Sequence, residues 1–154
     1  MFRIVSLPPF QAAASDVDPH WDFSPKGILG QFNAYFSKIT PELRDSFAPR
    51  DFLYYDAKRG GAIWMYALAP GMDAGGHDII DFEGGYYLTY AYWDGDEKAR
   101  VQCNREAMDY IEKSDRFELD NGRFAMGHII TPHEITVKFN WAQMEAFIPI
   151  KLKQ

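Results

Sequence analysis

The sequence predicts an α+β fold made of two similar halves, each with a strand, a helix and a pair of strands. Two segments with apolar residues at helical spacing, residues 22–38 and 97–113, are each flanked by segments with the composition of β-strands. The linker PGMDAGG, residues 70–76, separates the halves, because its glycines and proline interrupt regular structure. The architecture is therefore expected to repeat along the chain.

The length of 154 residues fits a single domain, with one half at residues 1–70 and the other at residues 77–154. Apolar residues make up 47% of the chain and can bury a sizeable core. The net charge of −6 disfavours nucleic-acid binding, which relies on basic side chains that contact phosphates. No apolar run approaches the roughly 20 residues that span a membrane, and the N-terminus lacks signal-peptide features, so we expect a cytoplasmic location.

The first half is expected to contain four strands and one helix. The helix begins near Ser24, which can cap it, and Pro25 suits the first helical position. Its apolar face consists of Ile28, Phe32, Tyr35, Phe36 and Ile39. A connector that includes a helical turn from Pro41 follows it. The strands are expected at residues 2–7, 10–17, 51–57 and 61–69.

The second half repeats this order. Its helix is expected from about Glu97 to Lys113, with Asp96 as the N-cap and Val101, Met108 and Ile111 as the buried stripe. A loop, residues 132–141, joins the last two strands. The strands are expected at residues 77–83, 86–93, 123–131 and 143–152.

Four stretches of sequence, in order along Phe2 to Lys151, together resemble the GyrI-like effector-binding domain family. This family also occurs C-terminal to the DNA-binding part of AraC-type and MerR-type regulators. The stretches are IVSLPPFQAAAS at residues 4–15, Tyr55-Asp56-Ala57, FEGGYY at residues 82–87 and FIPIK at residues 147–151.

The resemblance implies tandem βαββ repeats with pseudo-two-fold symmetry. An antiparallel sheet would carry the helices on one face, with a ligand groove between the halves. Members of the family bind lipophilic, often cationic, small molecules. The chain begins at its first strand, with no room for a helix-turn-helix, so it resembles a free-standing effector-binding domain.

The sequence departs from the family at a glutamate that many members use against the positive charge of the ligand. The aligned position is Ala125, so this carboxylate is absent. Ala125 and Gly127 should share a face with Ile148 and Ile150, which leaves extra volume, and Glu145 falls on the opposite face. Either a larger, less charged ligand fits, or recognition of a cation depends on aromatic faces, each worth about 0.5–2 kcal/mol.

Aromatic side chains are the strongest candidates for contact with a ligand. Tyr90 and Tyr87 alternate on the strand at residues 86–93, so both of its faces carry rings. One hypothesis is that Trp64, Tyr66 and Tyr90 form an aromatic cage around a flat or cationic ligand, and the alternative is that these rings are ordinary core. The further candidates are Phe32 and Phe36, which could close the same space, Tyr55, and Trp141, which is either a lid or a surface anchor.

The sequence indicates no catalytic residue, metal site or cofactor. The spacing of His20, His77, His128 and His133 matches no common zinc arrangement. No G-x-S-x-G elbow occurs, and none of the paired glycines opens a helix as a phosphate-binding loop does.

The predicted function is a stand-alone module that binds lipophilic aromatic or cationic small molecules, as a sensor or sequestering protein in transcription regulation or drug response. A regulator protein is a possible partner. The alternatives are a small-molecule hydrolase of the same family, which needs a carboxylate held in the cavity, and a protein-interaction module similar to gyrase inhibitors.

Overall fold

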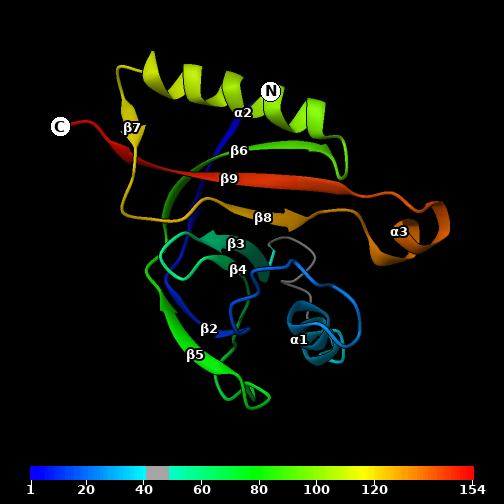
Figure 1. The fold of residues 1–154 in the computed structure, drawn as a ribbon. Helices are drawn as coiled ribbons and strands as arrows, with labels where there is room; N and C mark the ends of the chain where they lie inside the picture. Colours follow the sequence, from blue (N-terminus) through cyan, green and yellow to red (C-terminus); the bar gives the residue numbers. More distant parts are fainter. Residues whose placement is uncertain (41–48) are drawn as a thin grey trace. The chain divides into compact units, whose positions relative to one another are not determined.

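The computed structural model describes residues 1–40 and 49–154, which form two compact units (Figure 1). Unit 1 contains residues 1–7 and 85–154, and unit 2 contains residues 8–84. These units differ from the predicted halves, because the first strand pairs with a strand of the second half. The helical turn expected from Pro41 lies outside the described residues.

Unit 2 is a four-stranded antiparallel sheet with one helix. The strand order is β3-β4-β2-β5. Within each strand, successive side chains point to opposite faces of the sheet. Its elements are β2 (Phe10–Ala14), α1 (Ile28–Phe36), β3 (Asp51–Asp56), β4 (Gly61–Ala67) and β5 (Asp78–Phe82).

Unit 1 has the strand order β1-β6-β9-β8, again antiparallel, and the short β7 pairs with the end of β9. Figure 1 shows α2 alongside β6 and β9, with α3 at the opposite end of β9 from β7. The elements are β1 (Arg3–Leu7), β6 (Gly85–Trp93), α2 (Glu97–Glu112), β7 (Phe117–Leu119), β8 (Met126–Ile129), α3 (His133–Phe139) and β9 (Gln143–Leu152).

The same connectivity occurs in both units. In β2-α1-β3-β4 and in β6-α2-β8-β9, the last strand lies between the other two in the sheet. One further strand then pairs with the first strand of each repeat, β5 with β2 and β1 with β6. This confirms the α+β class and the predicted tandem βαββ repeats.

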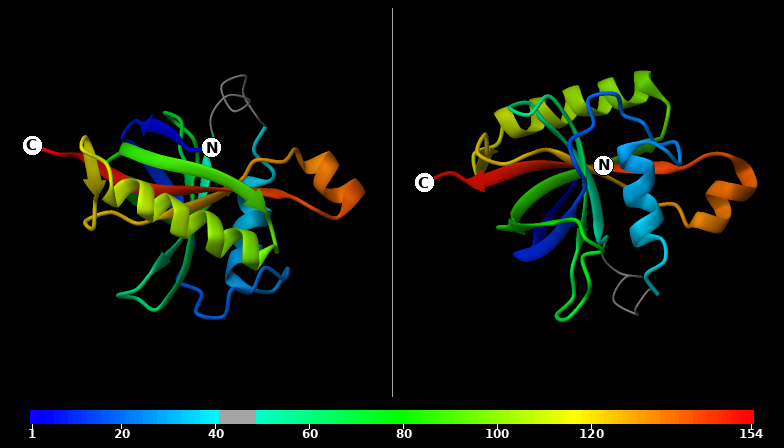
Figure 2. Two further views of the ribbon diagram at one scale, coloured as in Figure 1. Left: turned by 90° about the horizontal axis from the view of Figure 1, so that it is seen from above. Right: turned by 60° about the horizontal axis from the view of Figure 1, so that its bottom comes forward.

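Each of the two longer helices covers one face of the sheet in its own unit. In unit 2, Phe32 of α1 packs with Ala13 and Tyr66. In unit 1, α2 lies along the strands (Figure 2), and its Ala107 and Ile111 pack with Leu88 and with buried residues of β9. Each fully buried large apolar side chain contributes roughly 1.5–3 kcal/mol, so these faces hold the helices in place.

The start of α1 and the stripe of α2 differ from the prediction. Helix α1 begins at Ile28 after Gly27, and no side chain caps it, so Ser24 and Pro25 precede it in a turn. In α2, Asp96 caps as predicted and its Oδ1 accepts a hydrogen bond of 2.9 Å from the Ala99 N–H. Val101 is exposed, because the buried stripe follows Ala107 and Ile111 instead.

The predicted loop at residues 132–141 contains a helix, α3. Glu134 in its first turn and Lys138 in its last turn complement the helix dipole, and Asn140 ends it in the left-handed region with φ of 52°. No side chain of α3 is buried. The preceding strand is shorter than expected, and β7 was not predicted. Within residues 1–40 and 49–154, no helix is both long and apolar enough to cross a membrane.

Candidate ligand-binding site

Four predicted site residues gather under α1 in unit 2, and we call them the α1 ring cluster: Phe32, Phe36, Trp64 and Tyr66. The centroid of the Phe36 ring lies 4.9 Å from that of Trp64, edge to face, and 5.3 Å from that of Tyr66, stacked. Helical spacing on α1 and alternation on β4 bring these rings to one side of the sheet. Their role in ligand binding stays a prediction.

Polar groups fix two rings of this cluster. The Trp64 Nε1–H donates to the Asp51 carboxylate at 3.1 Å. The Arg50 guanidinium carbon lies 5.2 Å from the centroid of the Tyr66 ring, and Arg50 also donates to the Ala67 carbonyl at 2.8 Å. One face of Tyr66 therefore already holds a cation, in the geometry of a cation–π contact.

Tyr90, the third member of the predicted cage, belongs to unit 1 and packs under α2. Its hydroxyl donates to Asn104 Oδ1 at 3.3 Å. Burial raises the pKa of the Tyr90 phenol to about 12, with a further contribution from the neighbouring Tyr92. The cage that combines Tyr90 with Trp64 and Tyr66 stays a prediction, as does the groove between the halves.

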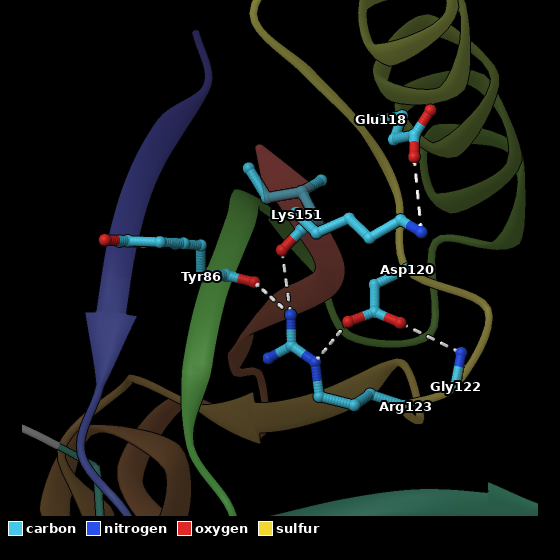
Figure 3. A network of polar contacts seen from close by, with 7 residues as sticks. Tyr86, Glu118, Asp120, Gly122, Arg123 and Lys151 are labelled. Carbon is cyan, nitrogen blue, oxygen red and sulfur yellow. Dashed lines mark hydrogen bonds and ion pairs between the residues drawn. The ribbon is translucent and has the colours of Figure 1, made fainter. Parts of the chain in front are cut away.

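Tyr87 and Tyr90 are an odd number of positions apart in β6, so Tyr87 points to the opposite face of the sheet. Its side chain is fully buried there. Its ring centroid is 6.1 Å from that of Phe147. The guanidinium carbon of Arg123 lies 4.7 Å from the Tyr87 centroid. Figure 3 shows how Arg123 is held: it donates to the Tyr86 carbonyl at 3.1 Å and forms an ion pair of 2.9 Å with Asp120.

Tyr55 and Trp141 are both exposed. The Tyr55 ring stacks on Trp21 with a centroid distance of 6.3 Å. The Trp141 ring meets Trp93 edge to face at 4.6 Å, and both indoles are exposed. Exposed paired rings fit the surface-anchor interpretation of Trp141 as well as the lid, and both stay open.

The register around Ala125 and Gly127 agrees with the prediction in part. Gly127 pairs with Ala146 and therefore shares a face with Ile148 and Ile150, whereas Ala125 is exposed and precedes β8. A Cβ atom at Gly127 would lie 3.1 Å from the sulfur of Met144. Met144 therefore occupies space that the sequence suggested would be open beside Gly127.

The structure contains a buried carboxylate that the predicted site did not include. Glu145 of β9 is 7% exposed in its side chain and forms an ion pair with Arg3 of β1, whose side chain is 64% exposed. Glu145 lies on the sheet face opposite the α2-covered residues Tyr90 and Ile148, as its register predicted. The sequence signal is a glutamate near the start of a largely apolar strand, directly before the apolar run from Ala146 to Ile150.

Thr89 lies on the same sheet face as Glu145. Thr89 pairs with Arg3 on one side and with Phe147 on the other, and residues two apart on a strand point to the same side. The Thr89 side chain is fully buried, and its Oγ1 has no hydrogen-bond partner among the described residues. Such a group costs about 1–3 kcal/mol when it is left unsatisfied, so it indicates a position where a bound molecule or water can supply a partner.

We call Arg3, Thr89 and Glu145 the Glu145 site. It combines a carboxylate, a hydroxyl that can donate or accept, and rings on the same sheet face at Tyr87 and Phe147. Such a set can bind a molecule with a positive charge and an apolar body. Among residues 1–40 and 49–154, no three His, Cys, Asp or Glu side chains gather in a way that could hold a metal ion.

Comparisons with known proteins concern the fold. No protein-family model matches the chain, and no curated protein matches it. The chain resembles SAV2435 bound to tetraphenylphosphonium, with 12% identity, a TM-score of 0.51, and coverage of 98% of this chain and 94% of that chain.

Two further solved structures have a similar fold. A hydrolase from Listeria innocua has 13% identity and a TM-score of 0.58, with coverage of 97% of this chain and 91% of that chain. The EcmrR C-terminal domain has 12% identity and a TM-score of 0.57, with coverage of 98% and 97%. At these identities the likeness shows the fold, which agrees with the fold that the family resemblance implied.

Proposed function

We propose that this chain binds lipophilic aromatic or cationic small molecules as an effector-binding domain, and that it serves as a sensor or sequestering protein. The observation that carries the proposal is the Glu145 site, a buried carboxylate beside the unsatisfied hydroxyl of Thr89 on a ring-bearing sheet face. The fold adds support, since the solved structure of SAV2435 with this fold is bound to tetraphenylphosphonium, a lipophilic cation.

The physical argument is the cost of a buried charge. A carboxylate removed from water is stable only when it is paired, and the partner of Glu145 is a largely exposed arginine that water can solvate elsewhere. A cationic ligand can take the place of Arg3 and also bury apolar surface, which Arg3 does not. The rings then contribute about 0.5–2 kcal/mol each as cation–π partners.

The α1 ring cluster, within unit 2, is a separate candidate for contact with an aromatic ligand. Trp64 is only partly buried and carries an indole held by Asp51, so a flat ligand can reach it without breaking the core. Tyr66 already accepts the Arg50 guanidinium on one face. This contact supports the expectation that aromatic faces contribute to the recognition of a cation.

The test is a titration with tetraphenylphosphonium, followed by calorimetry and tryptophan fluorescence. Tetraphenylborate, which has nearly the same shape and the opposite charge, is the matched ligand control. We expect the cation to bind with a sub-millimolar Kd and the anion to bind at least about tenfold more weakly, because charge-assisted contacts are worth about 1.5–3 kcal/mol. Equal binding of the two ions, or no binding of either, would contradict the proposal.

Two variants test whether Glu145 contacts the bound cation. Glu145→Gln should weaken tetraphenylphosphonium binding about tenfold or more, because the amide keeps the shape and removes the charge. Glu112→Gln, which neutralises an exposed carboxylate on α2, is the matched control and should leave the Kd unchanged. If both variants bind as the wild type does, the charged contact lies elsewhere.

The hydrolase and the protein-interaction module remain alternatives with less support. A hydrolase needs an acid or base at its binding site, and the carboxylate opposite Tyr66, that of Asp51, is only half-buried and already accepts from Trp64. Glu145 is already engaged in an ion pair with Arg3.

A further inference from the structure

A groove lies at the C-terminal end of α2 in unit 1, and we call it the α2-end groove. Helix α2 ends at Glu112, and beyond this point the sheet face below it is not covered by the helix. The groove has a volume of about 700 Å³. Its apolar lining consists of Ile4, Tyr86, Tyr110, Phe117, Ile150 and Leu152.

Several of these apolar residues are exposed to solvent, which is the feature that needs an explanation. Ile4, Tyr86 and Leu152 come from three different strands and are all exposed. Cross-strand pairing places Tyr86 beside Ile150 on the same side of the sheet. A contiguous exposed apolar surface of this kind is typical of a binding site.

The rim of the groove is basic in a chain whose net charge is −6. Lys113 and Arg116 line it, together with the carboxylate of Asp115. Lys151 also borders the groove, but it alternates with Ile150 and Leu152, so its side chain points to the opposite face of the sheet. Arg116 lies 3.7 Å from Asp115, and Lys151 lies 3.2 Å from Glu118. Both are exposed pairs, which typically contribute about 1 kcal/mol or less, so an anion can replace Asp115 beside Arg116 at small cost.

The floor of the groove is fixed from behind. Arg123 donates to the carbonyls of Tyr86 and Ile150, at 3.1 Å and 2.8 Å, and so ties β6 to β9 at two floor residues (Figure 3). A Cβ atom at Gly85 would lie 2.2 Å from an Arg123 nitrogen, so the guanidinium in its present position needs a glycine there. The groove is therefore preformed, which lowers the cost of ordering a ligand in it.

We propose that the α2-end groove binds a small amphiphilic anion, with a carboxylate, sulfonate or phosphate head on an aliphatic or aromatic body. The volume lies within the range of small-ligand sites, about 300–1,000 Å³. The exposed apolar floor takes the body, and Lys113 and Arg116 take the head. The α2-end groove shares no residue with the Glu145 site and prefers a ligand of the opposite charge. The inference therefore does not depend on the proposed function.

The test uses decanoate as the probe, with decyltrimethylammonium as a control of the same tail and opposite charge, both below the concentrations at which they form micelles. Binding is followed by backbone amide chemical shifts of the ¹⁵N-labelled protein. We expect decanoate to shift amides at Ile4, Tyr86 and Lys151. Across hexanoate, octanoate and decanoate, affinity should rise by up to about fourfold per buried methylene.

Matched charge reversals test the rim. Lys113→Glu with Arg116→Glu should lower decanoate affinity about tenfold and leave the fold intact, since both side chains are exposed. Lys98→Glu with Arg105→Glu reverses the same charge at exposed positions on α2 outside the groove lining, and it should have little effect. The inference is overturned if decanoate and decyltrimethylammonium bind equally, if the two double variants lose affinity equally, or if no groove amide shifts.

Discussion

Arg3 and Glu145 form an ion pair between residues 142 positions apart in the sequence, one in β1 and the other in β9. The two partners are unequally buried, since the arginine side chain is 64% exposed and the glutamate side chain is 7% exposed. The free-energy cost of desolvation therefore falls mainly on Glu145. Arg3, which compensates the charge of Glu145, is the more exposed partner, so water or a ligand can replace it more easily.

Removal of Arg3 should raise the affinity for a lipophilic cation, if Glu145 is the ligand carboxylate as proposed. Arg3→Gln deletes the competing charge, and we expect tetraphenylphosphonium to bind about fivefold more tightly, the factor that corresponds to about 1 kcal/mol. Arg105→Gln, at an exposed arginine on α2, is the control. Calorimetry gives both values. Weaker binding by Arg3→Gln than by the control would show that Arg3 supports the ligand rather than competing with it.

Substitution of Gly85 should destabilise the fold more than that of another turn glycine. Gly85 has φ of 121°, and an added Cβ atom would collide with Arg123, so Gly85→Ala strains the backbone and displaces a guanidinium with three polar partners. We expect a loss of about 3 kcal/mol or more in the free energy of unfolding. Urea denaturation followed by tryptophan fluorescence measures it.

The matched control is Gly60→Ala. Gly60 has φ of 73° and open space around its Cβ position, so the substitution carries the backbone cost alone, about 1 kcal/mol. Equal losses in the two variants would mean that the Arg123 network contributes little.

The stability of the protein should fall with alkaline pH in a way that depends on Tyr90. Burial keeps the phenol protonated in the folded state up to a pKa of about 12, whereas an unfolded phenol ionises near pH 10. The folded state then binds more protons, so this stabilisation is complete below about pH 10 and is lost as the pH rises towards 12.

Urea denaturation at several pH values between 9 and about 12 checks this expectation. The slope of stability against pH should be shallower in Tyr90→Phe than in the wild type. Tyr55→Phe, which removes an exposed phenol, serves as the matched variant. An identical slope in Tyr90→Phe and the wild type would contradict the assignment.

Asp18 should be one of the costliest carboxylates to remove. It is almost fully buried, and its two oxygens accept from the backbone N–H groups of His20 and Asp22, each at 2.8 Å. Asp18→Ala leaves two donors unsatisfied, and we expect a loss of about 2–4 kcal/mol in the free energy of unfolding. Asp73→Ala removes a similar bond to Gly75, but at an exposed position, and should cost less than about 1 kcal/mol. Thermal or urea denaturation that gives equal losses would contradict this ranking.

Local chemistry predicted most of the elements. The apolar period of 3.6 and Asp96 located α2 to within a residue, because its cap and its buried face depend on nearby side chains. The predicted cap at Ser24 was wrong, since Gly27 precedes the first turn of α1 instead. Helix α3 was missed because none of its residues is buried, so it has no apolar stripe to detect.

The sequence by itself determined the α+β class, the repeated strand–helix–strand-pair order and the abundance of rings, because these depend on residue type and short-range spacing. The tertiary structure alone decided that β1 pairs with β6, that Glu145 is buried against Arg3, and that Thr89 lacks a partner among the described residues. The physical reason is distance along the chain. Strand pairing joins residues whose separation leaves no local signal, and burial depends on which strands have paired.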